Sequence, residues 1–263
     1  MRLLQNLFGR EPSSLAVYKK LGYRNDQEGI LRRFLREEEG WRAHLEHSKQ
    51  SIREFYAGKN YKSIAILGSG WLLDVPIDDL LRDFEHIYLV DISHPRQITH
   101  KYRHAHNLHF VECDLTGGWA RHIYRCVYEK KFYTSADVFD CTPQKLSLPQ
   151  FDCVVSLNLL NQLDGLLLDA MEDCMVLTDS EIERFKTLVQ TQHIQFLSNY
   201  KYCLISDCEQ ISISKIDNSR EEKSLVFTPA TLPPLRHEWL WNFDSQGHYQ
   251  SDTIVQFRVK AFF

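Results

Sequence analysis

Long apolar runs are scarce in this sequence of 263 residues, and so are glycine and proline. The run Leu163–Leu168 is interrupted by Asp164 and Gly165, and no run approaches the ~18 residues of a membrane span. The apolar start of the chain is too short and too interrupted for a secretory signal, so we interpret it as a loosely held arm. Glycine occurs 11 times and proline 8 times, which excludes a collagen-like or low-complexity chain.

Paired cysteines and an excess of positive charge are also missing. The sequence has 7 cysteines, an odd number, and no C-x-x-C pair, which is typical of free thiols rather than a disulfide scaffold or a zinc ribbon. Lys and Arg number 31 against 35 Asp and Glu, for a net charge of −4, so we expect no nucleic-acid partner. We expect a cytoplasmic protein without membrane contact; the sequence does not indicate its oligomeric state.

A metal site is not expected either. His100 and His104 have the spacing of neighbours on one helix face, but no Cys, Asp or Glu lies between them to complete a ligand set. We interpret them as part of a solvated helix face.

The first 60 residues predict a helical cap. Apolar residues recur at helical spacing over residues 26–57, with Gly40 as the expected break and Glu37–Glu39 as an expected solvated face. From there the pattern changes, so we divide the chain into a helical cap, residues 1–60, and a second domain, residues 61–263.

Short apolar runs alternate with helical segments in that second domain. We expect strands at residues 63–67, 86–90, 108–111, 151–158 and 200–207, and two more at 239–243 and 253–259 around a polar loop. This order predicts the α/β class: a doubly wound, seven-stranded, mostly parallel sheet with a C-terminal antiparallel hairpin. In such sheets ligands bind at the carboxyl ends of the strands.

Polar or flexible residues end three of these strands. Gly68 and Gly70, around Ser69, allow the backbone to turn tightly and approach a ligand. Asp91 follows roughly 20 residues later, as expected for a carboxylate that accepts hydrogen bonds from a ribose diol. Asp114, one strand further, can accept from an adenine amino group. Together these residues predict a slot for an adenosine ligand.

The glycine loop distinguishes between adenosine ligands. A nicotinamide dinucleotide favours a third glycine in the pattern G-x-G-x-x-G, where this chain has Leu73. The bulky Trp71 and Leu72 also leave no cradle for a pyrophosphate. S-adenosylmethionine has no phosphate, so this loop favours it and disfavours a nicotinamide oxidoreductase.

Over residues 61–263 the sequence resembles the class I S-adenosylmethionine-dependent methyltransferases. Residues 67–76 and 90–95 more narrowly resemble bacterial proteins of that superfamily. The resemblance implies S-adenosylmethionine as cofactor and a small-molecule acceptor. It implies that Asn158, after the fourth strand, faces the transferred methyl group. The implied cofactor-binding residues are Gly68, Ser69, Gly70, Asp91, Ile92, Asp114 and Leu115.

His44 is the second candidate catalytic residue. It lies beside the apolar stripe of Trp41 and Leu45, in a segment that often covers the ligand in related methyltransferases. It is either an acid/base group or a packed or exposed histidine.

The sequence also departs from the pattern of the superfamily. Ile66 stands where an acid usually precedes the glycines, and Leu72 where a third glycine of G-x-G-x-G usually stands; Asp74 can substitute for the acid. Asn158 is not followed by Pro-Pro and an aromatic residue, which disfavours methylation of base or glutamine amide nitrogens. Two functions stay open: a methyltransferase for a small acceptor, or a non-catalytic adenosine-binding or protein-interaction module of the same fold.

Overall fold

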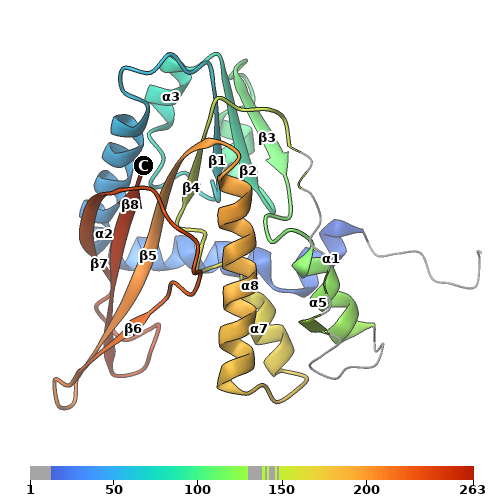
Figure 1. The fold of residues 1–263 in the computed structure, drawn as a ribbon. Coiled ribbons are helices and arrows are strands. Elements are labelled where there is room, and N and C mark those ends of the chain that lie inside the picture. The colour runs from blue at the N-terminus through green and yellow to red at the C-terminus, as the bar shows by residue number, and fades with distance from the viewer. Residues whose placement is uncertain (1–12, 130–137, 140, 142–145, 147) are drawn as a thin grey trace, which may run out of the picture.

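The computed structural model of this protein describes residues 13–263 except 130–137, 140, 142–145 and 147. One mixed sheet with the strand order β3-β2-β1-β4-β5-β8-β7 forms its centre (Figure 1). The strands on this path are β1 Ser63–Leu67, β2 His86–Asp91, β3 Leu108–Glu112, β4 Cys153–Leu157, β5 Lys201–Ser214, β7 Leu235–Asp244 and β8 Thr253–Phe262. Strands β1 to β5 are parallel, while β8 runs antiparallel to β5 and to β7. The predicted fold class is confirmed.

Helices cover both faces of the sheet. They are α1 Ser14–Lys20, α2 Tyr23–Tyr56, α3 Ile77–Asp83, α4 Arg96–Lys101, α5 Trp119–Tyr128, α7 Gly165–Glu172 and α8 Asp179–Leu197. Alternate residues of β1 enter two separate cores. Ala65 and Leu67 pack in the core that contains α5, α7 and α8, and Ile64 and Ile66 pack in the core that contains α2 and α3. Among the helices described, none has the length and apolar character to cross a membrane.

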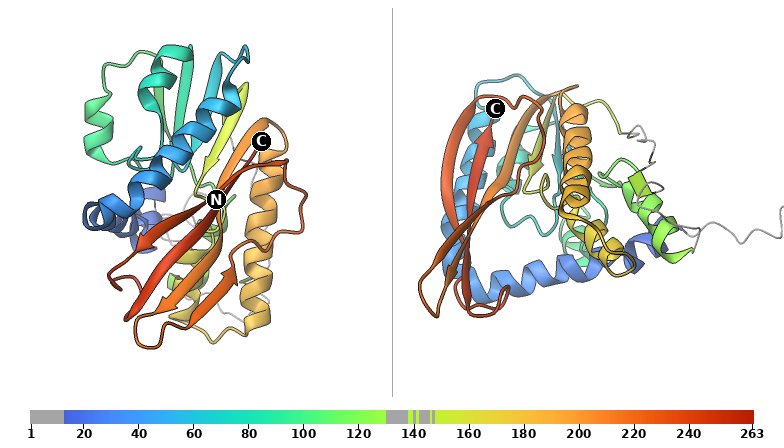
Figure 2. Two further views of the ribbon diagram at one scale, coloured as in Figure 1. Left: turned by 90° about the vertical axis from the view of Figure 1, so that its left-hand side faces the viewer. Right: turned by 60° about the horizontal axis from the view of Figure 1, so that its bottom comes forward.

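Helix α2 is bent, and the bend positions it around the site. Glu37 has φ −113° and ψ 21°, outside the helical region, and divides the helix into two segments. The first segment crosses below the carboxyl ends of the parallel strands, and the second runs along the face of the sheet (Figures 1 and 2). The second segment packs mainly against β7.

The bend corrects two predictions. Glu37 is only 5% exposed, rather than part of a solvated face. Its carboxylate accepts hydrogen bonds from the backbone nitrogen and hydroxyl of Ser245, at 3.2 and 2.8 Å, and this contact explains why the helix opens there. Gly40 is not the break. It allows close packing, because a Cβ there would lie 3.0 Å from the Asn242 carbonyl oxygen on β7.

Strand β5 is long, and its neighbour changes halfway along one edge. Residues up to Ile205 pair with β4, whereas residues from Glu209 pair with β6, Arg220–Ser224, which was not predicted. On the opposite edge, the pairing with β8 shifts register between Asp207 and Glu209. A bulge of this kind re-aims side chains, here just beyond the end of β4.

Some further elements differ from prediction. Helices α1 and α7 were not expected. Thr178 caps α8 through a capping box with Glu181. The predicted N-terminal arm and parts of the segment 129–149 lie outside the described residues.

Candidate functional site

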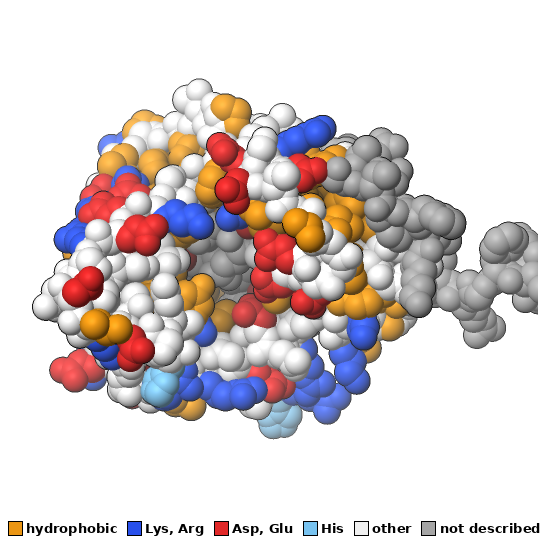
Figure 3. Space-filling model, turned by 90° about the horizontal axis from the view of Figure 1, so that it is seen from below, with side chains coloured by type: hydrophobic (Ala, Val, Ile, Leu, Met, Phe, Trp, Pro, Cys, Tyr) orange, Lys and Arg blue, Asp and Glu red, His pale blue; other side chains and the backbone are white. Residues whose placement is uncertain are grey.

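A cavity of about 520 Å³ lies at the carboxyl ends of the parallel strands. Its walls include Gly68, Asp91 and Asn158 from the ends of β1, β2 and β4, and Gln27 and Arg33 from the first segment of α2. The corresponding face of the molecule is hollowed, with acidic side chains along one side of the hollow (Figure 3). Its volume is in the range of small-molecule and cofactor sites.

The loop after β1 approaches the next strands closely. Gly68 has φ +75°, and a Cβ there would lie 2.9 Å from the carbonyl oxygen of Leu157. Gly70 has φ +41°, and Leu72, which stands where a third glycine was expected, has φ +57°. The loop therefore keeps a left-handed turn at a position that carries a leucine, which costs about 1–2 kcal/mol.

Asp91 joins three segments around the cavity. Its Oδ2 accepts from the Gly70 nitrogen at 2.8 Å, and its Oδ1 accepts from the Ile92 nitrogen at 2.7 Å and from Gln27 Nε2 at 3.0 Å. Burial raises the pKa of Asp91 above its usual value, and the backbone N–H groups of Gly70 and Ile92 oppose the rise. The predicted residues Gly68, Ser69, Gly70, Asp91 and Ile92 therefore lie together at the cavity.

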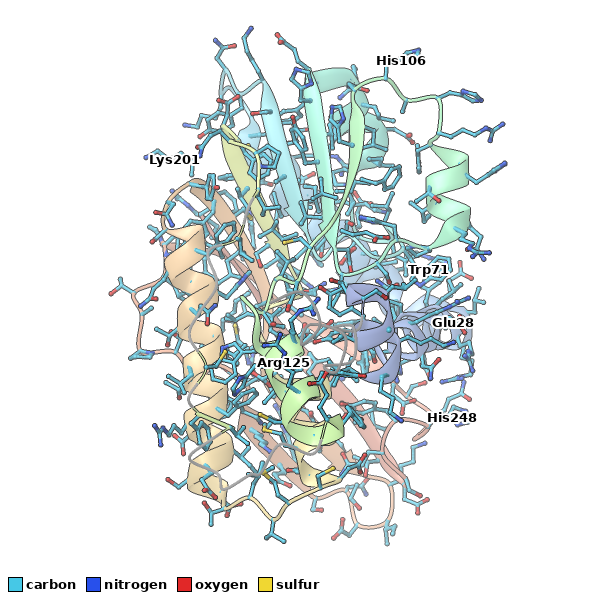
Figure 4. The ribbon with its side chains drawn as sticks, turned by 90° about the vertical axis from the view of Figure 1, so that its right-hand side faces the viewer. Glu28, Trp71, His106, Arg125, Lys201 and His248 are labelled. Atoms are coloured by element: carbon cyan, nitrogen blue, oxygen red, sulfur yellow. The ribbon has the colours of Figure 1, made fainter. Side chains whose placement is uncertain are left out.

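Gln27 and Trp71 hold the start of α2 over this loop. The Gln27 amide also donates to the Ser93 carbonyl at 2.9 Å, and Trp71 Nε1 donates to the Gln27 carbonyl at 2.8 Å. Figure 4 shows Trp71 beside the first turns of α2, where Glu28 is labelled. Sequence reasoning did not single out Gln27, because a polar residue on a helix face carries no signal of a distant partner.

The predicted residues after β3 divide into two groups. Leu115 lines the cavity together with Cys113 and Thr116. Asp114 does not, and its Oδ1 accepts from the backbone nitrogen and the hydroxyl of Thr116. Burial raises the pKa of Asp114. Its carboxylate closes the turn before α5, and a contact with adenine stays a prediction.

Asn158 and His44 meet on the cavity wall with Asp74. Asn158 has φ +47°, and its amide donates to Asp74 Oδ2 at 2.9 Å, while its Oδ1 has no partner among the described residues. Burial raises the pKa of Asp74 to about 6. His44 Nε2 lies 3.4 Å from the Asn158 amide nitrogen.

The surroundings of His44 define which nitrogen carries its proton. Trp239 Nε1 donates to His44 Nδ1 at 3.1 Å, so the neutral ring has its hydrogen on Nε2. The ring is 1% exposed and stacks on Trp241 with centroids 3.9 Å apart. Burial, followed by the nearby His47, lowers the pKa of His44 to about 3. At neutral pH the side chain is therefore a hydrogen-bond donor rather than a base, and its participation in catalysis stays a prediction.

Sequence reasoning missed a second buried carboxyl at the cavity, that of Asp207 on β5. It is 2% exposed, and its Oδ1 has no hydrogen-bond partner in the part of the chain that the structure describes. Burial raises its pKa to about 7, with a smaller contribution from the charge of Asp74, against the Asn161 amide. An acid at the end of an apolar strand was the signal that identified Asp91, and the same signal was present here.

Negative charge prevails in the cavity. Its lining contains one Arg or Lys among the described residues, Arg33, against the carboxyl groups of Asp26, Asp74, Asp91, Asp169 and Asp207. The guanidinium of Arg33 lies 4.6 Å from the ring centre of Phe243 and 5.1 Å from that of Tyr249. The part of the chain that the structure describes has no group of three metal-ligating side chains. The arrangement suits a cationic ligand.

No protein-family model matches this sequence, and a search of curated proteins finds no match. Solved structures similar in fold include N-methyltransferase NodS from Bradyrhizobium japonicum with S-adenosylhomocysteine, with 10% identity, TM-score 0.36, and 82% of this chain and 85% of that chain covered. The 1,6-didemethyltoxoflavin-N1-methyltransferase of Burkholderia thailandensis has 9% identity, TM-score 0.40 and coverages of 97% and 93%. The DhpI–SAM–HEP complex has 14% identity, TM-score 0.34 and coverages of 95% and 84%.

The sheet itself identifies the fold. Five parallel strands in the order 3-2-1-4-5, followed by an antiparallel pair at one edge, form the Rossmann-like sheet that the resemblance to class I methyltransferases implied. The chain therefore has a Rossmann-like α/β fold with a C-terminal antiparallel pair.

Proposed function

We propose that this protein is an S-adenosylmethionine-dependent methyltransferase for a small-molecule acceptor. The observation that carries the proposal is the hydrogen bond from the Gly70 nitrogen to Asp91, which joins the glycine loop to the acid of β2 at the rim of the cavity. Both are elements that an adenosine ligand requires at this position of the fold. The helical segment before residue 60 acts as a cap over the domain of residues 61–263.

The donor set of the cavity fits the cofactor. Gly68 and Gly70 would face its methionine part, Asp91 its ribose, and Leu115 its adenine. The ribose would take the place of the Gln27 amide on Asp91 Oδ1. When bound, S-adenosylmethionine supplies a methyl group on a positively charged sulfonium, and the acidic lining favours such a charge.

The residues of this chain would mainly position the reactants. Methyl transfer needs alignment of nucleophile, methyl carbon and sulfur, and such alignment can supply several kcal/mol. Asn158, whose Oδ1 has no partner among the residues described, can orient the acceptor, and His44 can donate a hydrogen bond from Nε2. Gln27 and Arg33 of the first segment of α2 line the site, and this segment would limit access of water.

A non-catalytic module of the same fold is the second candidate. It is favoured by the bonds that Asp91 already makes, since Gln27 holds the oxygen that a ribose needs. A protein in which the Gln27 amide stays bonded to Asp91 would not bind the cofactor.

Thermal unfolding with added ligands separates a protein that binds the cofactor from a module whose site stays closed to it. S-adenosylmethionine and S-adenosylhomocysteine should each raise Tm, because ligand at a hundredfold excess over Kd stabilises the folded state by about 2.7 kcal/mol. NAD should not, because the loop lacks a pyrophosphate cradle. An unchanged Tm with all three ligands would favour the non-catalytic module.

A further inference from the structure

The side chain of Asp207 lies on the β5 side of the cavity, separated from β1 and the glycine loop by β4. Asn158, which follows β4, donates its backbone nitrogen to the Ile205 carbonyl at 2.8 Å, and Leu225 donates to the Cys208 carbonyl at 2.8 Å. Asp207 therefore lies on β5 at the point where the neighbouring strand changes from β4 to β6. Strand β4, which Asn158 follows, lies between β5 and the strand that carries the glycine loop. It lines the cavity.

The carboxyl group of Asp207 lacks, among the described residues, a partner that would compensate its charge. Its Oδ1 is buried without a hydrogen bond to any of them, in a side chain that is 2% exposed. The nearest influences on it are the Asn161 amide and a second carboxyl, Asp74. A buried carboxyl oxygen without a hydrogen-bond partner destabilises the folded protein. Such oxygens are therefore rare, and they cluster at sites where a ligand supplies the missing hydrogen bond.

Aromatic rings complete this side of the cavity. Trp241, Phe243 and Tyr249 line it, with ring centres 4.9 Å apart for Trp241 and Phe243 and 5.1 Å apart for Phe243 and Tyr249. Phe243 and Tyr249 already face one cation, the guanidinium of Arg33. Ring faces attract cations and apolar groups, and repel anions.

We propose that the methyl acceptor is a small amine with an apolar carbon skeleton, and that Asp207 binds its nitrogen and removes a proton from it. This inference rests on the proposed function. A carboxylate acceptor would meet five aspartates, and an alcohol would leave the charge of Asp207 uncompensated. An ammonium group satisfies Oδ1 through a charge-assisted hydrogen bond, while the rings cover the carbon skeleton.

The transfer then proceeds in two steps. The bound ammonium gives one proton to the Asp207 carboxylate, which frees the lone pair of the nitrogen. That pair forms a bond to the methyl carbon while the carbon–sulfur bond breaks, and the bonding pair of that bond stays on sulfur. The product leaves as a methylated ammonium ion, and Asp207 returns its proton to water.

Binding of matched ligands to protein saturated with S-adenosylhomocysteine tests this inference. The probes are 2-phenylethylamine, 2-phenylethanol and 3-phenylpropanoate, titrated by calorimetry. The amine should bind at least about tenfold more tightly than the other two. Asp207→Asn should reduce this preference to less than about threefold, and the control Glu112→Gln, which changes an exposed acid outside the cavity lining, should keep it.

Three results would overturn the inference while the proposed function stands: no preference for the amine, a preference that survives Asp207→Asn, or a loss of S-adenosylhomocysteine affinity of about tenfold in that variant. The last would assign the carboxyl to the amino group of the cofactor. Failure of the wild type to bind S-adenosylhomocysteine would instead overturn the proposed function, and this inference with it.

A second measurement needs no variant. Between about pH 6 and pH 8 the amine keeps its proton while Asp207 loses its own, so the amine should bind to the wild type more tightly as pH rises. The groups that face Asp207 are Asp74 before α3, Tyr249 between β7 and β8, Cys208 beside it, and the uncharged Asn161. Weaker amine binding at the higher pH would contradict the proposal.

Discussion

Asp91 and Asn158 both follow apolar strands, but their side chains make different bonds. Asp91 accepts from the backbone of the glycine loop and from α2, whereas Asn158 donates to a buried carboxyl and leaves its own oxygen without a partner among the described residues. The first arrangement fixes the shape of the site, and the second leaves a polar atom for a ligand. The position of each residue could be predicted, because a strand end is visible in sequence.

Asp207 gave the same signal, an acid at the end of a predicted strand, but that signal does not show which side chains face the cavity. The direction in which the Asp207 side chain points depends on the bulge between β5 and β8, and the β8 residues lie about fifty positions later in the chain. The Asp114 side chain presents the opposite case, since its position was predicted but its Oδ1 bonds within its own turn. Local pattern therefore locates polar residues, and tertiary contacts decide which of them face the cavity.

The backbone of Asn158 makes its substitution informative. Asn158→Ala removes the hydrogen bond to Asp74 and places alanine at φ +47°, so it should reduce the free energy of unfolding by about 2 kcal/mol. Asn158→Gly loses the same bond without the strain, and should be roughly 1 kcal/mol more stable than the alanine variant. Urea unfolding measures both, and equal stabilities would show that the left-handed turn is not retained.

Protonation of Asp207 makes stability depend on pH. Its pKa is about 7 in the folded protein and about 3.9 when unfolded, so the folded state holds an extra proton between these values. This contribution is fully present below about pH 4 and is lost as pH rises through about 7. From pH 5 to pH 8, Asp207→Asn should therefore gain roughly 2.5–3 kcal/mol relative to the wild type, because the unequal proton binding spans about two pH units.

Urea unfolding of both proteins at several pH values measures this difference. His44 and His193, whose pKa values burial lowers to about 3 and about 4, act in the opposite direction. They are present in both proteins, so their contribution cancels in the comparison. A difference that does not change with pH would show that Asp207 has an ordinary pKa.

Among the elements, α2 connects the site to the rest of the fold. Its first segment supplies Gln27 and Arg33 to the cavity, and its second supplies His44. The helix was predicted from its apolar spacing, but its bend depends on Ser245, which is 208 residues away in the chain. A local sequence pattern does not reveal a contact between residues so far apart in the chain.

Local sequence pattern was sufficient to predict some of the strands but not all of them. The parallel strands were predicted because each is a short apolar run with a polar or glycine boundary. Strand β6 has the sequence Arg-Glu-Glu-Lys-Ser, all exposed, and is held by backbone pairing to β5. A strand without apolar residues carries no periodic signal to detect.

The two glycines within α2 should respond in opposite directions to alanine. A Cβ added at Gly29 would meet no atom of the described residues within 4 Å, so Gly29→Ala should stabilise the protein by about 0.5–1 kcal/mol through helix propensity. At Gly40 the Cβ would lie 3.0 Å from the Asn242 oxygen, so Gly40→Ala should destabilise it by about 1–2 kcal/mol. Urea unfolding of both variants checks this, and stabilisation by Gly40→Ala would contradict the close packing of α2 on β7.

In the molecule as a whole, the sheet brings segments from across the chain to one edge. The glycine loop, the acid of β2, the end of β4 and the middle of β5 surround one cavity, to which α2 also contributes side chains. Among the residues that line the cavity, carboxyl groups outnumber cations, and Trp241, Phe243 and Tyr249 add aromatic rings. This combination favours a positively charged cofactor and an amine acceptor over an anionic substrate.

Calorimetric titration of S-adenosylhomocysteine tests the assignment of the cofactor site most directly. The wild type should bind one equivalent, and Asp91→Ala should raise Kd at least about tenfold, because a charge-assisted hydrogen bond contributes about 1.5–3 kcal/mol. The matched control is Glu112→Ala, which removes an exposed acid opposite Asp91 in β3, outside the cavity, and should leave Kd unchanged. No binding to the wild type, or equal affinity in Asp91→Ala, would contradict the account.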